Sequence, residues 1–345
     1  MRILITTGIF PPDIGGPAKY ALNLQKSFKK AGHMTSVASY NSTERMLPTG
    51  IRHLFFLLRI LPRLFLTDIV IALDTFSVGL PSVIAASLLG KFSVLRIGGD
   101  FLWETYEERT KKPIFLSEFY RTPKILSLKE KTIFSLSGWA MRHASSLVFT
   151  TNWLKEIFKK AYSLNPERLS IINNYFEPLL IENGNQLNDK EKFFISSARN
   201  IFIKNKDKVS TAFNLAQKKD PTIKLVDKQM DFDSFQEAIA SSYAIIVASV
   251  SEVSPNLILE AIQRGKPFIV TKDIGMKDIL GDIAVFVDPL SVNDIGQKVL
   301  FLADKQNYAK QTAKIRNWDF HHSWDEIATE FISVYEKYDT RRKGR

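Results

Sequence analysis

The chain has 345 residues, the usual length of two domains of ordinary size. Its 45% hydrophobic content is typical of a globular protein, and the absence of cysteine excludes disulfides and thiolate metal sites. The formal net charge is +11, and residues 1–175 account for it with 23 Lys and Arg against 12 Asp and Glu, whereas residues 176–345 carry 24 of each. This asymmetry favours an anionic partner. Because no nucleic-acid-binding motif is present, we expect an anionic membrane surface and no nucleic acid.

The N-terminal segment is expected to form a strand, a glycine-rich loop and a helix. Residues 2–7 are apolar enough for a buried strand, and residues 17–30 have the pattern of a helix that Gly32 ends. Between them, Gly15 and Gly16 allow the backbone to approach a ligand closely. The dinucleotide fingerprint is absent, so a tight turn and a ligand-binding loop are alternative interpretations. Because the chain enters this pattern directly, we expect no signal peptide and a cytoplasmic protein.

Two apolar stretches follow. Residues 51–66 mix bulky apolar side chains with three arginines. This predicts either an interfacial helix lying peripherally on a membrane or a core helix whose arginines reach the surface. Residues 69–90 have the length of a membrane span, but they contain an Asp and a Pro. We therefore divide them into a buried strand near 68–73 and an apolar helix over 78–89.

A further strand over residues 92–97 ends in Gly98-Gly99-Asp100. Parallel sheets bind ligands at the carboxyl ends of their strands, so Asp100 is the acidic group best placed to meet an acceptor or a sugar. The alternative is that Asp100 caps a helix or a turn. Residues 101–142 have the composition of an insertion with long helices, whose basic and aromatic side chains suit an acceptor or a membrane surface.

The second half opens with a candidate phosphate site. Residues 193–199 have the pattern of a strand that ends at Arg199, and Lys204 follows five residues later. Two fixed cations offset the charge of a phosphate, and Arg can bind it with two hydrogen bonds. The alternative is that both are surface charges of a Lys-rich loop.

A strand–loop–helix–strand unit lies farther on. Apolar strands are expected over residues 243–249 and 266–271, with a helix between them. Ser254 is the expected N-cap of this helix, Pro255 its first residue, and Gly265 its end.

Two carboxylates flank the start of the same helix, Glu252 just before it and Glu260 along it. The N–H groups of Asn256 and Leu257 lie between them at the N-terminus of the helix, where they form an anion site. An anion held there, with a carboxylate on each side, suits a nucleotide sugar. The alternative is an ordinary turn with one solvated Glu.

These patterns resemble the family 4 glycosyltransferases, retaining enzymes of the GT-B fold. The resemblance covers nearly the whole chain and is sharpest in the Glu-x7-Glu pair and in the spacing of Arg199 and Lys204. It implies an α/β protein of two Rossmann-like domains facing across a cleft. Residues 1–175 would form the acceptor-side domain, residues 176–320 a shortened nucleotide-sugar donor domain, and residues 321–345 a helix that crosses back to the first domain, with a basic tail.

The resemblance also implies roles for the candidate residues. Glu252 would contact the transferred sugar, Glu260 the nucleotide ribose, and Arg199 with Lys204 the diphosphate. With Asp100 on the acceptor side, the catalytic residues would be Glu252, Asp100, Arg199 and Lys204. The donor-binding residues would be Gly15, Gly16, Arg199, Lys204, Asn256, Leu257 and Glu260. Transfer to a glycan or lipid-linked acceptor would retain the anomeric configuration and need no metal and no cofactor besides the donor.

Two departures from the family pattern leave other functions open. Gly99 stands where the family has His, and between Arg199 and Glu252 the chain has room for only one strand and one helix before residues 243–249. A strand–helix unit that commonly supplies nucleobase contacts is therefore missing. The alternatives to a transferase are a nucleotide-sugar epimerase on the same fold and a non-catalytic GT-B-like protein that binds a sugar or nucleotide.

Overall fold

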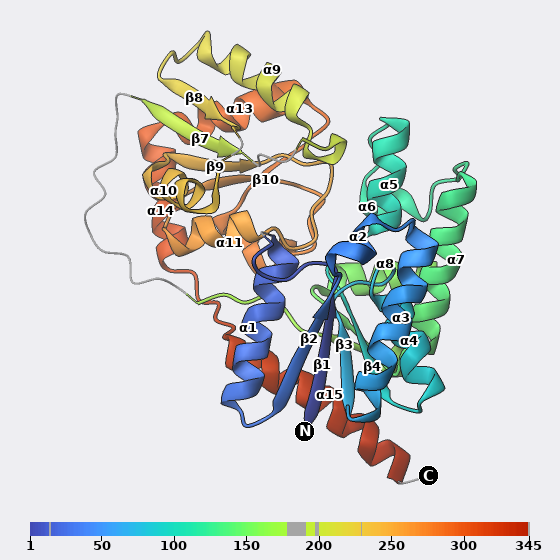
Figure 1. Cartoon of the computed structure of the whole chain (residues 1–345). Coiled ribbons are helices and arrows are strands. Elements are labelled where there is room, and N and C mark those ends of the chain that lie inside the picture. The colour runs from blue at the N-terminus through green and yellow to red at the C-terminus, as the bar shows by residue number, and fades with distance from the viewer. Residues whose placement is uncertain (14, 178–190, 197–199, 229, 344–345) are drawn as a thin grey trace. The chain divides into compact units, whose positions relative to one another are not determined.

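The computed structural model describes residues 1–13, 15–177, 191–196, 200–228 and 230–343 (Figure 1). The chain divides into two compact units. The first contains Met1–Leu102, Lys124–Tyr175 and His322–Arg345, and the second contains Trp103–Pro123 and Phe176–His321.

The first unit is built on a parallel six-stranded sheet with the strand order β2-β1-β3-β4-β5-β6. Its strands are β1 (Arg2–Thr7), β2 (Met34–Ser39), β3 (Ile69–Ala72), β4 (Phe92–Ile97), β5 (Ser146–Phe149) and β6 (Leu169–Ile171). Every residue of β3 and β5 is buried, as expected for central strands of a parallel sheet covered on both faces. The carboxyl ends of β1 and β4 therefore open on one edge, where the Gly15 loop and Asp100 begin.

Helices cover this sheet, and the last helix of the chain is one of them (Figure 1). They are α1 (Gly16–Lys30), α2 (Ser42–Met46), α3 (Thr49–Phe65), α4 (Gly79–Leu88), α7 (Leu128–His143), α8 (Asn152–Ala161) and α15 (Trp324–Lys343), with a 3-10 turn, η1 (Pro166–Arg168). Helices α1 and α15 pack together: the rings of Tyr20 and Trp324 lie 5.0 Å apart, and Ser27 donates a hydrogen bond of 3.0 Å to Asp325. The C-terminal helix thus returns to the first unit, as the resemblance implied.

The second unit has a parallel five-stranded sheet with the order β11-β10-β9-β7-β8. Its strands are β7 (Lys192–Ser196), β8 (Ile223–Val226), β9 (Ala244–Val247), β10 (Phe268–Thr271) and β11 (Val285–Val287). Side chains alternate across β7, so Phe194 packs on Phe213 of α9 (Lys206–Gln217) with ring centroids 5.4 Å apart. Ile195 points to the other face and joins the cluster of Ile258 of α11 (Asn256–Gln263). Hydrophobic clusters therefore cover both faces of this sheet.

Its helices come from two parts of the sequence. They are α5 (Phe101–Thr110, from Trp103 onward), α6 (Leu116–Phe119), α9 (Lys206–Gln217), α10 (Phe232–Ser241), α11 (Asn256–Gln263), α12 (Lys277–Leu280), α13 (Val292–Ala303) and α14 (Lys305–Arg316), with the 3-10 turns η2 (Phe202–Lys204) and η3 (Gly281–Ile283). The expected first domain of residues 1–175 is thus corrected, because residues 103–123 belong to the second unit through contacts described below. Between α9 and β9 the described residues form one strand and one helix, as predicted.

The apolar stretch 69–90 forms β3 and α4, as expected. Across the described ranges, no helix is both long enough and apolar enough to cross a bilayer.

Candidate active site

An ion pair between Lys204 and Glu252 is the centre of the candidate site. The two residues are 48 positions apart in sequence, and the ammonium of Lys204 contacts Oε1 of Glu252. The side chains are 7% and 12% exposed, so each charge depends on its partner to replace lost hydration. Ser249 donates a second hydrogen bond to the same carboxylate oxygen, at 2.6 Å. The fold therefore unites two of the predicted residues.

The backbone around Lys204 is held by the residue that follows it. Asn205 adopts a left-handed conformation with φ 55°, which Asn tolerates better than most residues, and it ends η2. Its side-chain amide nitrogen, Nδ2, donates to the carbonyls of Ala248 (3.1 Å) and Pro289 (2.6 Å). The loop that carries Lys204 is thereby tied to the carboxyl end of β9.

The backbone around Glu252 is held on two sides. Glu252 donates its N–H to the carbonyl of Asp273 at 3.0 Å, and its own carbonyl accepts from Gly275 at 3.0 Å, which makes a short parallel bridge. Two residues earlier, Val250 donates to the carbonyl of Ile203 at 2.8 Å. The two loops that supply the ion pair are thus hydrogen-bonded directly to each other.

Helix α11 follows the Glu252 loop, but it begins one residue later than predicted. Pro255 is its N-cap and Asn256 its first residue. Ser254 is therefore not its N-cap, and the Ser254 hydroxyl donates to the sulfur of Met276 at 3.2 Å. Pro255 makes no side-chain hydrogen bond to this helix end. The first N–H groups of the helix, those of Asn256 and Leu257, lie at its positive end, which suits an anion.

Glu260 lies on α11 within a polar network. Gln236 of α10 donates to Glu260 Oε2 at 3.3 Å, and Arg264 donates to the Gln236 side-chain oxygen at 2.6 Å and to the Glu260 carbonyl at 3.2 Å. These bonds orient the Glu260 carboxylate relative to α10. It can still accept hydrogen bonds, since an ionised carboxylate has about four acceptor positions.

Three predicted residues lie in the first unit. Gly15 immediately precedes α1, and a Cβ at this position would lie only 2.7 Å from Ile9 Cδ1, so a larger residue would force Ile9 to move. Gly16 is the first residue of the helix. Asp100 follows β4 and is 4% exposed. Burial lowers the pKa of Lys124, and the negative charge of Asp100 opposes that shift, so the two charges interact.

Other predicted features fall outside this geometry. Arg199 lies outside the described residues. Asp231 and Asp233 form an Asp-x-Asp pattern that the sequence analysis did not predict, and Asp231 uses its carboxylate to cap α10, accepting the N–H of Ser234 at 3.0 Å. In the parts of the chain that the structure describes, no three or more His, Asp or Glu side chains are grouped so as to hold a metal ion.

Sequence reasoning missed several residues that support the site. Ser249, Ser251 and Asp273 all hydrogen-bond around Glu252, and all three are polar residues just past the ends of β9 and β10. Polar side chains that follow a buried parallel strand are a recognisable signal, because they gather at the ligand-binding edge of the sheet.

Comparison with known proteins bears on the fold. No protein-family model matches the chain, and no curated protein matches its sequence. Among solved structures, the chain is similar to Anabaena HepE in complex with UDP, at 13% identity over 100% of both chains, with a TM-score of 0.64. It is similar to a glycosyltransferase from Rickettsia africae, at 14% identity over 98% of both chains, with a TM-score of 0.59.

A third similar structure is a UDP-forming α,α-trehalose-phosphate synthase from Burkholderia xenovorans in complex with glucose-6-phosphate. Its identity is 10%, over 96% of this chain and 99% of that chain, and the TM-score is 0.68. At such identities, likeness shows the fold alone. With its two parallel sheets, the chain has the GT-B fold of these glycosyltransferases.

Proposed function

We propose that the protein is a glycosyltransferase that moves a sugar from a nucleotide sugar to a glycan or lipid-linked acceptor. The observation that carries this proposal is the nearly buried Lys204–Glu252 pair in a GT-B fold, with Glu252 just before the start of α11. Such a site offers a cation and backbone N–H groups to a diphosphate, and a carboxylate to sugar hydroxyls. The UDP bound to HepE and the UDP-forming activity in the trehalose-phosphate synthase name favour UDP as the nucleotide.

The roles of the donor-site residues follow from their chemistry. Lys204, with Arg199 as a second cation, binds the diphosphate together with the N–H groups of Asn256 and Leu257. Glu252 accepts hydrogen bonds from the sugar, and Ser249 fixes the orientation of the Glu252 carboxylate. Glu260 accepts a hydrogen bond from the ribose.

In the reaction, the bond between the anomeric carbon and the diphosphate oxygen breaks, and an acceptor oxygen bonds to that carbon on the same face. The acceptor proton passes to the departing phosphate. Charge builds up on the diphosphate in the transition state, so preorganised cations and N–H groups supply the main catalytic effect, and no metal is required. Asp100 belongs to the acceptor side of this scheme, and Gly15 and Gly16 remain candidate donor-binding residues.

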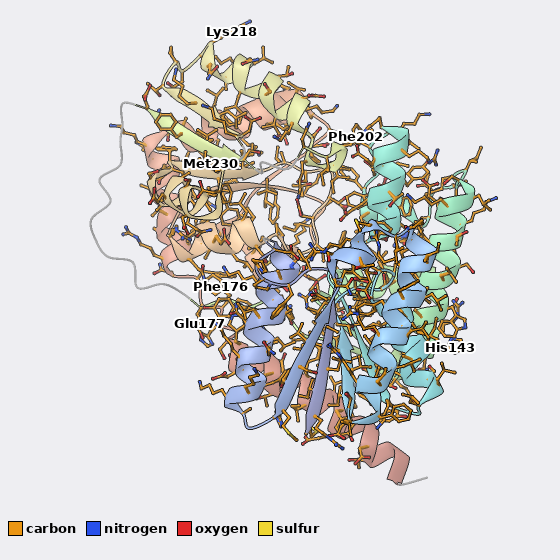
Figure 2. The ribbon with its side chains drawn as sticks, in the orientation of Figure 1. His143, Phe176, Glu177, Phe202, Lys218 and Met230 are labelled. Carbon is orange, nitrogen blue, oxygen red and sulfur yellow. The ribbon has the colours of Figure 1, made fainter. Side chains whose placement is uncertain are left out.

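The proposal is tested by binding and by turnover. Thermal shifts are measured with UDP, GDP, ADP, dTDP and CMP, for the wild type and for Lys204→Met. The matched control is Lys218→Met, which changes an exposed lysine of the same unit (Figure 2). We expect one nucleotide, UDP, to stabilise the wild type and the control but not Lys204→Met. Absence of a shift with every nucleotide would contradict a donor site and favour a degenerate GT-B-like protein.

Turnover then separates a transferase from an epimerase. Incubation of the wild type with the UDP-sugar that binds, with and without glycan and lipid-linked acceptors, is followed by analysis of nucleotide and sugar products. A transferase releases UDP in proportion to the acceptor that becomes glycosylated. Conversion of the nucleotide sugar into an isomer without any acceptor would identify an epimerase instead.

A second proposal concerns a peripheral contact with an anionic membrane surface through α3. One side of this helix is exposed and apolar over Ile51, Leu54, Phe55, Leu58, Phe65 and Leu66, which are 48–66% exposed. The positive charge of residues 1–175 complements an anionic surface. The helix arginines turn towards the protein, since Arg59 binds Glu44 and Arg52 donates to the Glu44 carbonyl at 2.9 Å. The exposed side is therefore left for apolar contact with lipid.

A further inference from the structure

Residues 103–123 contain α5 and α6 and belong to the second unit, although the chain before and after them belongs to the first. This segment contacts both loops that supply the Lys204–Glu252 pair. One contact comes from α5 and the other from the start of α6.

The first contact fixes the start of the 3-10 turn that ends at Lys204. Phe202, labelled in Figure 2, donates its N–H to Oε2 of Glu108 on α5 at 2.9 Å. Lys111, one helical turn farther, pairs with Glu108 and lies 5.5 Å from the centre of the Phe202 ring. The Lys111 bond and the Phe202 N–H hold the pKa of Glu108 below its usual value, so the acceptor is ionised. Phe202 is thus attached to α5 through its backbone and its ring.

The second contact fixes the residue next to Glu252. Leu116 donates its N–H to the hydroxyl of Ser251 at 2.8 Å, and Ser251 donates to Asp273 Oδ2 at 2.5 Å. Ser117 donates its hydroxyl to Asp273 Oδ1 at 2.5 Å. The Asp273 carbonyl accepts the Glu252 N–H, so α6 is connected to Glu252 through Ser251, its neighbour in sequence, and through Asp273.

The two contacts are held at a set spacing because the turn between α5 and α6 is braced by α5. Trp103 donates its indole N–H to the carbonyl of Ile114 at 2.8 Å, and Ile114 donates its N–H to Glu107 at 2.5 Å. Both polar groups of Ile114 are therefore bound by side chains of the helix that also carries Glu108. A displacement of α5 would move both loops together.

We infer that the segment 103–123 is a positioning element that sets the geometry of the Lys204–Glu252 pair, with Glu108 and Ser117 as its positioning residues. The catalytic consequence rests on the proposed function. If the pair binds diphosphate and sugar, loss of either contact misplaces one of its partners while leaving both charges present. Small misplacements of this kind lower turnover more than they weaken binding.

The test measures hydrogen exchange and kinetics for Glu108→Ala and Ser117→Ala. The matched controls are Glu118→Ala in the same segment and Ser135→Ala on α7, both at exposed positions. We expect amide exchange over residues 200–205 to become about tenfold faster in Glu108→Ala, and over residues 248–254 in Ser117→Ala, with no change in the controls. Unchanged exchange in both loops would overturn the inference, whether or not the protein is a transferase.

Kinetics separate positioning from general damage. In an active wild type, we expect kcat to fall at least about tenfold in both variants, with the KM for the donor changed less than about threefold. Glu108→Gln and Ser117→Thr, which keep an acceptor and a hydroxyl, should recover most of the lost turnover. Wild-type kcat in both alanine variants would overturn the inference. A wild type without nucleotide binding or turnover would refute the proposed function, and the exchange data would then decide the positioning role alone.

Discussion

Lys204 and Glu252 form a nearly buried ion pair whose loops are hydrogen-bonded to each other through Val250 and Ile203. In a low-dielectric site such a pair contributes little net stability, because the desolvation cost offsets the attraction. A pair of this kind is therefore expected to serve the site more than the fold. In the proposed donor site, these two charges would contact the diphosphate and the sugar.

Removal of one partner should destabilise the protein more than removal of both. Lys204→Met leaves the Glu252 charge without its cation, so we expect the free energy of unfolding to fall by about 2–4 kcal/mol. Adding Glu252→Gln should restore part of that loss, with a coupling energy of about 1 kcal/mol or more in a double-mutant cycle. Urea unfolding of the wild type, the single variants and the double variant measures this. Strict additivity would contradict a coupled pair.

Glu260 and Lys204 should affect different parts of the donor. If Glu260 binds the ribose, Glu260→Ala should weaken UDP binding by about tenfold or more and leave pyrophosphate binding unchanged. Lys204→Met should weaken both ligands, since both carry the diphosphate. Calorimetric titration with each ligand gives the comparison, and Gln236→Ala controls for loss of the network around Glu260. An equal effect of Glu260→Ala on both ligands would refute the ribose assignment.

Much of the fold was predictable, and so was the gathering of Lys204 and Glu252 at one sheet edge, because both follow from local patterns. Buried apolar runs predicted β3 and β4. The apolar run of β9, followed by Glu252 and a helical pattern, predicted an acidic side chain beside the start of a helix. β2 was missed because it is an edge strand with few buried residues, and its Met34 is 68% exposed. The start of α11 was predicted one residue too early, since Pro255 and not Ser254 is its N-cap. The Ser254 hydroxyl donates to Met276, a contact that no local pattern contains.

The residues that surround the site could not be predicted, because they are far apart in sequence and no local pattern contains their contacts. Glu108 lies 94 positions from Phe202, and Ser117 lies 156 positions from Asp273. Such contacts depend on where a whole insertion packs, whereas helical and strand periodicity reports only burial of each element. The assignment of residues 103–123 to the first domain was wrong because chain order does not reveal which unit an insertion joins.

Glu107 should make stability depend on pH. The residue is fully buried, and burial raises its pKa to about 7 from the usual 4.5, against the opposing effect of the Ile114 N–H. Between these values the folded state holds a proton that the unfolded state has lost. The free energy of unfolding therefore falls as pH rises, and this contribution is complete below about pH 4.5 and lost above about pH 7.

Glu107→Gln should remove this dependence. We expect the stability difference between wild type and Glu107→Gln to change by about 2–3 kcal/mol between pH 5 and pH 8, with the wild type losing stability relative to the variant. Comparing the two proteins cancels the opposite effect of His33 and His53, whose pKa values burial lowers. Urea unfolding at several pH values gives the profiles. A constant difference would show that Glu107 is ionised throughout.

Gly79 at the start of α4 should not tolerate a side chain. A Cβ there would lie 2.1 Å from the backbone oxygen of Asp74, and this contact can be relieved only by moving the backbone. We expect Gly79→Ala to lower the free energy of unfolding by about 3 kcal/mol or more. Gly50→Ala is the control: its Cβ would meet nothing within 4 Å, so it should be neutral or stabilising by up to about 1 kcal/mol. Equal stability of the two variants would contradict this packing.

The exposed side of α3 should decide whether the protein binds anionic vesicles. Leu54 and Leu58 are 55% and 56% exposed, and their substitution removes apolar area without touching the buried residues Phe56 and Ile60. We expect Leu54→Gln combined with Leu58→Gln to weaken binding to phosphatidylglycerol-containing vesicles by about tenfold or more, with little change in stability. Flotation and urea unfolding measure the two quantities.

The matched control for α3 is Leu215→Gln on α9, where a leucine is 47% exposed in the second unit. This variant should bind vesicles as the wild type does, because a protein that binds lipid through α3 does not need apolar contacts from α9. Neutral phosphatidylcholine vesicles should bind the wild type more weakly, since the excess positive charge of residues 1–175 contributes only with anionic lipid. Equal loss of binding in Leu215→Gln would mean that general apolar exposure causes the association. Wild-type binding by the α3 variant would place the membrane contact elsewhere.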